Sequence, residues 1–366
     1  MTPAAPSSAI GCELPLDFAP RLIAWQRLHG RHGLPWQQTR DAYRVWLSEV
    51  MLQQTQVSTV LAYYPRFLAA FPTVQALAEA SGDQVMALWA GLGYYSRARN
   101  LHRCAQTVVG EHGGVFPASA EQLQTLPGIG ASTAAAIAAF CHGERVSIVD
   151  GNVRRVLSRL LAFDQDLAQM AGQRALWDLA QGLLPHAPAP DDMVAYTQGL
   201  MDLGATVCLR SKPLCERCPV HSLCAAKAAD AVGRYPVKSK AVKRRHESWW
   251  LLVLRLHPAE VANEADRFWL QIRPAPGIWA GLYCPLVFAS EELLRATLPI
   301  GASEKIEYLE PVSHSLTHRE LRLHPVLVTT TADQAFGSDG LWATASELLE
   351  RGLPTPVRAL YQRLPA

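Results

Sequence analysis

Four cysteines crowd into one short segment of this 366-residue chain. Cys208, Cys215, Cys218 and Cys224 follow the spacing C-x6-C-x2-C-x5-C, whereas the other four of the eight cysteines are isolated. Thiolates this close together indicate a metal site in a reducing compartment. Structural zinc sites usually show two C-x-x-C pairs, whereas the longer loops found here suit a larger cubane. The pattern therefore favours an iron–sulfur cluster over zinc, and disulfides least.

A carboxylate that could act as a general acid lies in the segment DAYRVWLSEVMLQQ, residues 41–54. The apolar residues of this segment recur at helical spacing, which predicts an amphipathic helix: Tyr43, Trp46, Leu47 and Val50. Glu49 has largely apolar neighbours, which would raise its pKa if its side chain faces inward. An exposed surface carboxylate is the plainer alternative.

A second carboxylate, Asp150, directly precedes the segment GNVRRVLSRLL. The apolar residues of that segment form one helical stripe: Val153, Val156, Leu157, Leu160 and Leu161. Asp150 therefore stands where a helix N-cap belongs, and the helix N-terminus is expected to keep its carboxylate ionised. Capping alone would explain the residue, but capping and catalysis are compatible.

A glycine-rich turn separates two short helical patterns. Ser119, followed three residues later by Gln122, predicts a helix start, and LPGIG at 126–130 ends that helix before ASTAAAIAAF begins another. Such a hairpin leaves backbone N–H groups pointing outward at a helix start, where an anion such as a DNA phosphate is favoured. The same pattern also occurs as an ordinary turn.

Composition bounds the remaining possibilities. The length predicts two or three domains, and 49% hydrophobic with 18% charged residues is typical of a globular protein. No apolar run approaches the ~18 residues of a membrane span, and the first residues lack the pattern of a secretory signal, so we expect a cytoplasmic protein without a membrane partner.

The formal net charge is only +2, but residues 226–247 carry an excess of Lys and Arg. With little apolar content and no period, this stretch is interpreted as a solvated linker, which is compatible with a DNA contact. Beyond it, SWWLLVLRL and RFWLQIRP predict strands, and LWATASELLERG predicts a helix start. The mixture indicates a separate α/β domain.

Five of these segments occur in one order that resembles the MutY-type adenine DNA glycosylases, a family of the helix-hairpin-helix superfamily that also contains endonuclease III: LSEVMLQQTQV, GLGYYSRARNL, LPGIGASTA, VDGNVRRV and the cysteine array. The resemblance runs from about residue 20 to 330. It implies a multidomain protein, with an all-α helix-hairpin-helix glycosylase core, a [4Fe-4S] cluster domain and a C-terminal α/β MutT (Nudix)-like domain. The implied bounds are 34–144 for a six-helix barrel with the hairpin, 1–33 and 145–228 for the cluster domain, 229–247 for the basic linker and 248–366 for the MutT-like domain.

The resemblance also implies a reaction, the removal by base flipping of adenine mispaired with 8-oxoguanine or guanine in double-stranded DNA. Glu49 would be the general acid that protonates N7 of the adenine, and Asp150 would stabilise the oxocarbenium-like sugar. Asn152 would hold the sugar or a water beside Asp150. The four clustered cysteines would hold the [4Fe-4S] cluster, and we expect a monomer.

Residues that would contact DNA follow from the same resemblance: Gln54, Thr55, Leu92, Tyr94, Gly128, Gly130, Ser132, Thr317 and His318. Gln54 and Tyr94 match positions that wedge into the duplex. In the C-terminal part, PGIWAGLYCP and SHSLTHREL match, but the family more often has Phe-Ser-His where this chain has Leu316, Thr317 and His318. The glutamate-rich metal box of nucleotide hydrolases does not occur in this region, which favours a lesion-recognition domain.

Two other classes of function remain open. An endonuclease III-like bifunctional glycosylase and lyase would carry a lysine nucleophile in the second hairpin helix, where this chain has Ser132, and no lysine occurs between residues 1 and 211. The other alternative is either a DNA-binding iron–sulfur protein without catalytic activity or a nucleotide hydrolase. Glu49 and Asp150 argue against the first of these, and the missing metal box argues against the second.

Overall fold

The computed structural model describes six stretches of the chain: 14–239, 244–257, 265–298, 305–316, 318–330 and 340–364. The chain divides into two compact units. The first unit comprises residues 1–57 and 107–240, and the second comprises residues 58–106 and 241–366. These bounds differ from the domain bounds expected from the sequence, which stay a prediction.

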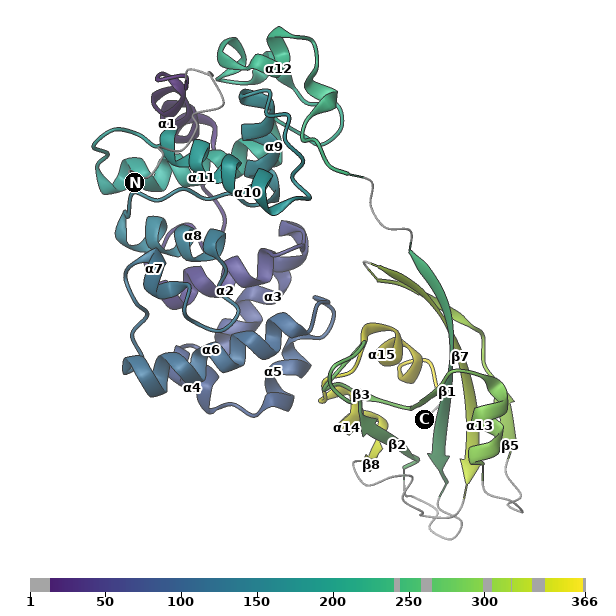
Figure 1. Cartoon of the computed structure of the whole chain (residues 1–366). Coiled ribbons are helices and arrows are strands. Elements are labelled where there is room, and N and C mark those ends of the chain that lie inside the picture. Colours follow the sequence, from purple (N-terminus) through teal and green to yellow (C-terminus); the bar gives the residue numbers. More distant parts are fainter. Residues whose placement is uncertain are drawn as a thin grey trace, which may run out of the picture. The chain divides into compact units, whose positions relative to one another are not determined.

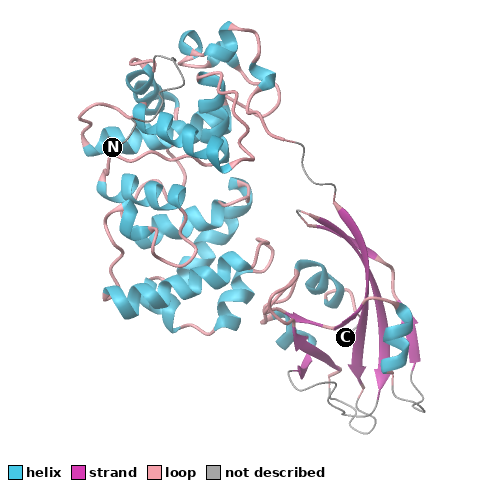
Figure 2. Ribbon diagram, in the orientation of Figure 1, coloured by secondary structure: helices cyan, strands magenta, loops and turns pink. Residues whose placement is uncertain are grey.

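The described part of the first unit is helical (Figure 2). Its α-helices are α1 (Phe18–His29), α2 (Ala42–Leu52), α7 (Ala120–Leu123), α8 (Ala131–His142), α9 (Gly151–Leu160), α10 (Met170–Gly182), α11 (Pro190–Thr206) and α12 (Ala225–Ala228). Single 3-10 turns follow at Cys215–Arg217, His221–Leu223 and Val232–Arg234. Helix α11 packs against α1, α8 and α9, so segments far apart in the sequence lie side by side (Figure 1).

Side-chain caps explain where the key helices begin. The Asp41 carboxylate accepts hydrogen bonds from the backbone N–H groups of Tyr43 and Arg44 at the start of α2. Ser119 caps α7 through the N–H of Gln122, and Asp150 caps α9. Each cap satisfies a backbone donor that has no partner within its own helix. The helix starts predicted from the sequence are therefore confirmed.

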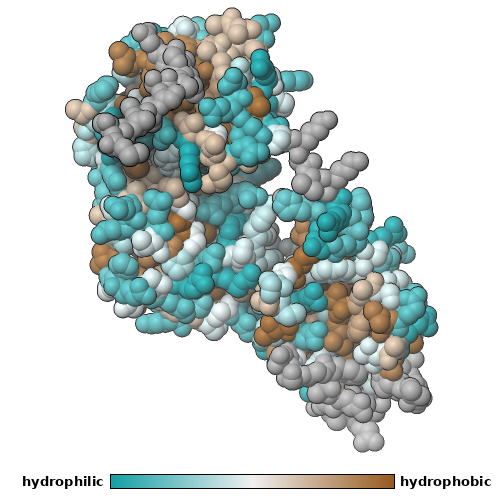
Figure 3. Space-filling view, in the orientation of Figure 1, coloured by the Kyte–Doolittle hydropathy of each residue, from teal (hydrophilic) through white to brown (hydrophobic). Residues whose placement is uncertain are grey.

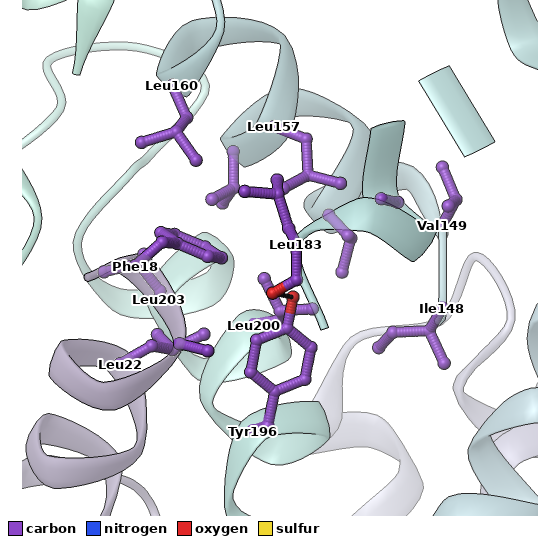
Figure 4. Close-up of a cluster of buried hydrophobic side chains, with 14 of the residues drawn as sticks. Phe18, Leu22, Ile148, Val149, Leu157, Leu160, Leu183, Tyr196, Leu200 and Leu203 are labelled. Atoms are coloured by element: carbon purple, nitrogen blue, oxygen red, sulfur yellow. Dashed lines mark hydrogen bonds between the residues drawn. The ribbon is translucent and has the colours of Figure 1, made fainter. Parts of the chain in front are cut away.

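One hydrophobic core joins α1, α8, α9, α10 and α11 of the first unit (Figure 4). Its fully buried side chains include Phe18, Leu22, Leu157, Leu200 and Leu203. Tyr196 is also buried in this core, and its hydroxyl donates a hydrogen bond to the Leu183 carbonyl oxygen at 3.2 Å. The apolar stripe predicted for α9 is part of this core, which places Asp150 on a well-anchored helix.

The segment expected to be a linker, 229–247, is partly folded. Tyr235 is buried, and its carbonyl oxygen accepts a hydrogen bond from Nε of Arg159. The backbone N–H of Leu167 donates to the Val237 carbonyl oxygen at 3.0 Å. Strand β1 already begins at Arg245. These hydrogen bonds attach the described residues up to 239 to the rest of the first unit. Amino-acid composition did not indicate them, because the acceptors are backbone carbonyl oxygens.

The helices of the second unit come from the middle of the sequence: α3 (Val57–Ala70), α4 (Val74–Glu79), α5 (Gly82–Trp89) and α6 (Ser96–His112), with the ends of α3 and α6 crossing into the first unit. Phe67 and Trp89 pack edge to face, with ring centroids 6.1 Å apart. Between α5 and α6 runs the GLGYY loop, in which Tyr94 adopts a left-handed backbone conformation.

The C-terminal residues of the second unit form a mixed sheet with eight strands among the described residues (Figure 2). The strands are β1 (Arg245–Leu256), β2 (Arg267–Ile272), β3 (Tyr283–Cys284), β4 (Leu286–Phe288), β5 (Lys305–Tyr308), β6 (Val312–Ser315), β7 (Arg319–Thr330) and β8 (Gly340–Thr344). Strands β1 and β7 pair in parallel along their whole length, and the other pairs are antiparallel.

Three helices accompany the sheet: α13 (Glu291–Thr297), α14 (Ala345–Leu349) and α15 (Thr355–Tyr361). The predicted α/β class and the first two predicted strands are confirmed. The segment LWATASELLERG begins as a strand and not as a helix, since Thr344 is both the end of β8 and the N-cap of α14. Aromatic and branched residues before the cap favour the strand.

Hydrophilic side chains dominate the visible surface (Figure 3). Apolar side chains gather on the sheet-bearing part in the same view, and the exposed large apolar residues there include Leu293, Ile306 and Tyr308. Within the part of the chain that the structure describes, no helix has the length and apolarity needed to cross a membrane.

Candidate active site and metal centre

Helix α2 places Glu49 at the edge of a cavity. The predicted apolar face of the helix is buried, with Trp46 and Leu47 fully inaccessible. Glu49 lies beside this face, half-buried, and lines a cavity of about 570 Å³ together with Trp36, Phe140 and Met201. The interpretation of Glu49 as an exposed surface residue is therefore wrong, and the cavity is a candidate base pocket.

The surroundings of Glu49 favour its protonated form. Burial raises the pKa of Glu49 to about 8, and the negative charge of Asp150 contributes in the same direction. A carboxylic acid that keeps its proton at neutral pH can act as a general acid. The raised pKa predicted from the apolar neighbours is thus confirmed, and the charge of Asp150 is a second cause that only the folded chain supplies.

Asp150 occupies the N-cap of α9. Its Oδ1 accepts a hydrogen bond from the Val153 N–H at 2.7 Å, as the sequence predicted. Burial nevertheless raises its pKa and outweighs the lowering by the N–H groups of Val153 and Asn152 and by two arginines. The helix N-terminus was expected to keep Asp150 ionised, and its N–H groups do lower the pKa, but the net shift is upward because the carboxyl is also desolvated.

Asn152 is held by Arg155. Its Oδ1 accepts a hydrogen bond from Nη2 of Arg155 at 2.9 Å, and the same guanidinium donates to the carbonyl oxygens of Gly204 and Cys208. A side chain at position 204 would bring a Cβ to 2.7 Å from Cβ of Asn152, so only glycine allows this approach of α9 and α11. The start of α9 is thereby connected to the segment that carries the cysteines.

An ion pair between Arg31 and the buried Asp202 positions part of the wall of the Glu49 cavity, and nothing in the sequence pattern indicated it. Nε of Arg31 donates to Oδ1 of Asp202 at 2.7 Å, and the backbone N–H of Arg31 donates to Oδ2 at 2.9 Å. Asp202 is completely buried and also accepts from Gln198 at 2.8 Å. Arg31 lines the cavity, so Asp202 fixes a cation in the wall of the candidate base pocket.

The glycine-rich hairpin has the predicted geometry. Gly128 adopts a left-handed φ of 77°, and Gly130 is the N-cap of α8 without a side-chain cap. A Cβ at Gly130 would meet nothing within 4 Å, so the backbone here is open to a ligand. Ser132 is half-buried in the first turn of α8. Backbone N–H groups at this turn can therefore receive an anion.

Two of the expected DNA-wedging residues are exposed on loops. Gln54 is exposed with φ 55°, and Thr55 after it is half-buried. Tyr94 is 46% exposed, whereas Tyr95 is buried and donates its hydroxyl to the Leu353 carbonyl oxygen. The expectation that one of the two tyrosines packs inward is confirmed.

Leu92 differs from the expected DNA contact. It is buried, since its side chain packs inward where the chain turns toward Tyr94. A residue's neighbours in sequence do not reveal this inward packing.

The predicted lesion-reading residues are only partly described. Thr317 lies outside the described residues. His318 is exposed and lines a cavity of about 560 Å³ in the second unit, together with Tyr94, Trp279 and Leu316. Leu316 and His318 thus border the same cavity as the GLGYY loop, although the two segments are far apart in the sequence.

The four clustered cysteines line one small cavity of the first unit, as their spacing predicted. Each of them is a free thiol. Arg159 is buried beside them, and its Nη1 donates to Sγ of Cys208 at 3.3 Å. Among the described residues, no three ligating side chains are close enough to hold a single metal ion. Four cysteine thiols around one cavity are a donor set that suits a thiolate-bound metal group.

Comparisons with known proteins identify the family. Residues 47–181 match the HhH-GPD superfamily of base excision DNA repair proteins, and residues 259–363 match the NUDIX domain. The adenine DNA glycosylase of Buchnera aphidicola subsp. Acyrthosiphon pisum is 30% identical over 355 residues, which cover 94% of this chain and 97% of that protein. This chain belongs to the adenine DNA glycosylases.

Two further relatives match shorter stretches of this chain. The human adenine DNA glycosylase is 48% identical over 219 residues, which are 57% of this chain and 39% of the human protein. The solved structure of a thermostable thymine-DNA glycosylase is 26% identical, with a TM-score of 0.50, and covers 58% of this chain and 95% of its own. The multidomain class, with a helix-hairpin-helix core and a Nudix domain, is confirmed for this chain.

Proposed function

We propose that the protein hydrolyses the N-glycosidic bond of adenine mispaired with 8-oxoguanine, or with guanine, in duplex DNA. The observation that carries the proposal is Glu49, a carboxyl with a pKa of about 8 at the edge of a 570 Å³ cavity and under the influence of the Asp150 charge. A neutral acid and a nearby carboxylate are the two groups that cleavage of a purine glycosidic bond needs.

The two carboxyls have separate roles in this mechanism. Adenine leaves poorly as an anion, so Glu49 donates its proton to N7 of the flipped base. Asp150 faces the sugar, which becomes oxocarbenium-like as the bond breaks. A carboxylate ~4 Å from a developing cation contributes about 4 kcal/mol at an effective dielectric of about 20, or roughly a thousandfold in rate. Asn152, oriented by Arg155, holds the sugar or the attacking water.

The adenine must leave the base stack before it can enter the cavity. Flipping costs a few kcal/mol and less at a mispair than in a matched duplex. The hairpin at Gly128 and Gly130 would hold a backbone phosphate, and the exposed Gln54 and Tyr94 would fill the space left in the duplex. Leu92 is too deeply buried to share this role.

Discrimination between 8-oxoguanine and guanine requires a contact with the opposite strand. The lesion differs by an oxygen at C8 and a hydrogen at N7, so a hydrogen-bonding side chain can supply roughly 1–3 kcal/mol of preference. Thr317 and His318 are the candidates, supported by the exposure of His318 in a cavity that Tyr94 also lines.

We further propose that the enzyme is monofunctional. A lyase needs an amine that forms a Schiff base with the sugar, but the second hairpin helix carries Ser132, and the first lysine of the chain is Lys212. Water would therefore be the acceptor of the sugar, and the DNA strand would stay intact.

Cys208, Cys215, Cys218 and Cys224 would hold a [4Fe-4S] cluster, supported by four free thiols around one cavity. When bound, the cluster supplies four metal–thiolate bonds that fix the loops between the cysteines. The buried Arg159 places a positive charge beside these thiolates. Purified protein should contain about four irons and acid-labile sulfide per chain. Stoichiometric zinc without sulfide would contradict the assignment.

The proposal is tested by measuring adenine release under single-turnover conditions from duplexes with adenine opposite 8-oxoguanine, guanine or thymine. We expect the fastest release opposite 8-oxoguanine and no borohydride-trapped adduct. The double substitution Thr317→Val with His318→Ala should reduce the preference for 8-oxoguanine over guanine while release opposite guanine persists. Absence of release from all three duplexes would refute the proposed function, and an efficient trapped adduct would refute the monofunctional assignment.

A further inference from the structure

A cavity of about 410 Å³ lies beside the hairpin, in the first unit, and apart from its hairpin residues none of its lining has a role in the function proposed above. One end is formed by Gly130, Ala131 and Ser132 at the start of α8, and Val149 lines it next to Asp150. The other side is lined by residues of α9 and α10. We call it the α8–α10 cavity.

Two arginines give the α8–α10 cavity a positive charge. Arg154 and Arg174 line it, and none of its described lining residues is acidic. Nε of Arg154 donates to the Val149 carbonyl oxygen at 3.3 Å, which turns its guanidinium along this wall. Arg174 is exposed and makes no hydrogen bond or ion pair with any described residue. An arginine left without a partner in a cavity suits an anionic ligand.

The helix termini and the apolar wall add to this match. Neither α8 nor α10 has a side-chain cap at its N-terminus, and the first residue of each helix, Ala131 and Met170, lines the cavity. Trp177 is half-buried in the wall, and Met170 is 63% exposed. Positive groups beside an apolar surface fit an alternation of phosphate and deoxyribose.

We infer that the α8–α10 cavity binds a second backbone phosphate of the DNA strand that carries the adenine, with Arg154 and Arg174 as its ligands. The inference rests on the proposed function, in which the hairpin holds one phosphate and Asp150 faces the sugar of the same strand. The cavity borders both the hairpin and the residue before Asp150, so a strand held at both places would pass its opening.

Arg174 is the residue to test, because Arg154 also lowers the pKa of Asp150 and its loss would disturb the active site. Binding of the full-length protein is measured by fluorescence anisotropy at several salt concentrations. The duplex carries 2′-fluoro-2′-deoxyadenosine opposite 8-oxoguanine, because the fluorine slows cleavage. Arg174→Ala should weaken binding about fivefold and make the slope of log K against log salt shallower by about 0.9, the value for one lost phosphate contact.

Two variants control for other effects of the substitution. Arg174→Lys keeps the charge and should keep the wild-type slope. Arg363→Ala removes the same charge from an exposed residue after α15 and should also leave the slope unchanged. Identical slopes for the wild type and Arg174→Ala would overturn the inference, and so would an equal change in Arg363→Ala.

Backbone neutralisation then locates the contact. Duplexes in which one phosphate at a time is replaced by an uncharged methylphosphonate are compared for the wild type and Arg174→Ala. One position on the adenine strand should weaken wild-type binding and leave the variant unaffected, because the variant has already lost that contact. Equal losses at every position would overturn the inference. Failure of the wild type to release adenine would refute the proposed function instead, a separate readout.

Discussion

Glu49 in the last turns of α2 and Asp150 at the start of α9 both have a carboxyl group, but the surroundings of the two groups differ. The backbone N–H groups near Glu49 are used within its helix, so burial acts on this carboxyl without compensation and its pKa rises to about 8. Asp150 accepts a backbone N–H and lies near two arginines, which oppose the effect of burial. The position within the helix thus determines how far backbone N–H groups offset the effect of burial on each carboxyl.

The largest expected effect comes from the carboxyl that keeps the proton. Glu49→Gln removes the proton donor without changing its size, so adenine release should fall by about 10²–10⁴-fold, the usual contribution of a general acid. Binding of the mispaired duplex should persist. Single-turnover release and anisotropy measure the two quantities. Near-normal release would remove Glu49 from the mechanism.

The second carboxyl is tested by Asp150→Asn. Asparagine caps helices as well as aspartate does, so the fold should persist while the charge near the sugar is lost. The rate of release should fall roughly a thousandfold. Circular dichroism of the variant provides the control for folding. A rate close to that of the wild type would mean that Asp150 is only a cap.

The raised pKa of Glu49 should also make the stability of the fold depend on pH. The pKa of Glu49 is raised, so its favourable contribution to stability is complete below the unfolded-state value of 4.5 and is lost as pH rises toward about 8. The unfolding free energy of Glu49→Gln minus that of the wild type should therefore increase by roughly 2–4 kcal/mol as the pH is raised from acidic to mildly alkaline values. Denaturant unfolding at several pH values measures this gain. A difference that does not change with pH would show that Glu49 has an ordinary pKa.

The smallest effect concerns the coupling between the two groups. The wild-type rate should decline as pH rises through about 8, since Glu49 must be protonated to act. In Asp150→Asn the pKa of Glu49 should fall, because the charge of Asp150 is the second of its two causes, and the decline should begin at a lower pH. The shift should be smaller than the part due to burial. An unchanged pH profile of the residual activity would show that the two groups are not coupled.

Most local features of the site could be predicted from the sequence. Asp41, Ser119 and Asp150 cap the helices that the patterns predicted, and the four cysteines line one cavity as their spacing indicated. Such features depend on residues a few positions apart. They could be recognised because caps and ligand loops need particular side chains at fixed spacing.

Longer-range features could not be predicted in this way. The contact of Arg31 with Asp202 joins residues 171 positions apart, and nothing near either residue indicates the other. Leu92 packs inward, although its position in the GLGYY loop suggested a DNA contact. The linker was expected at 229–247, but carbonyl oxygens of its described residues accept hydrogen bonds from other parts of the first unit.

The sequence by itself indicated where α2, α7 and α9 begin, and that one glutamate, one aspartate and four thiols are available for chemistry. These properties follow from local propensity and spacing. The tertiary structure alone decided that the charge of Asp150 acts on Glu49, that burial outweighs the helix terminus at Asp150, and that Arg159 lies against Cys208. Electrostatic effects of this kind depend on distance and on exclusion of water, and both exist only once the chain has folded.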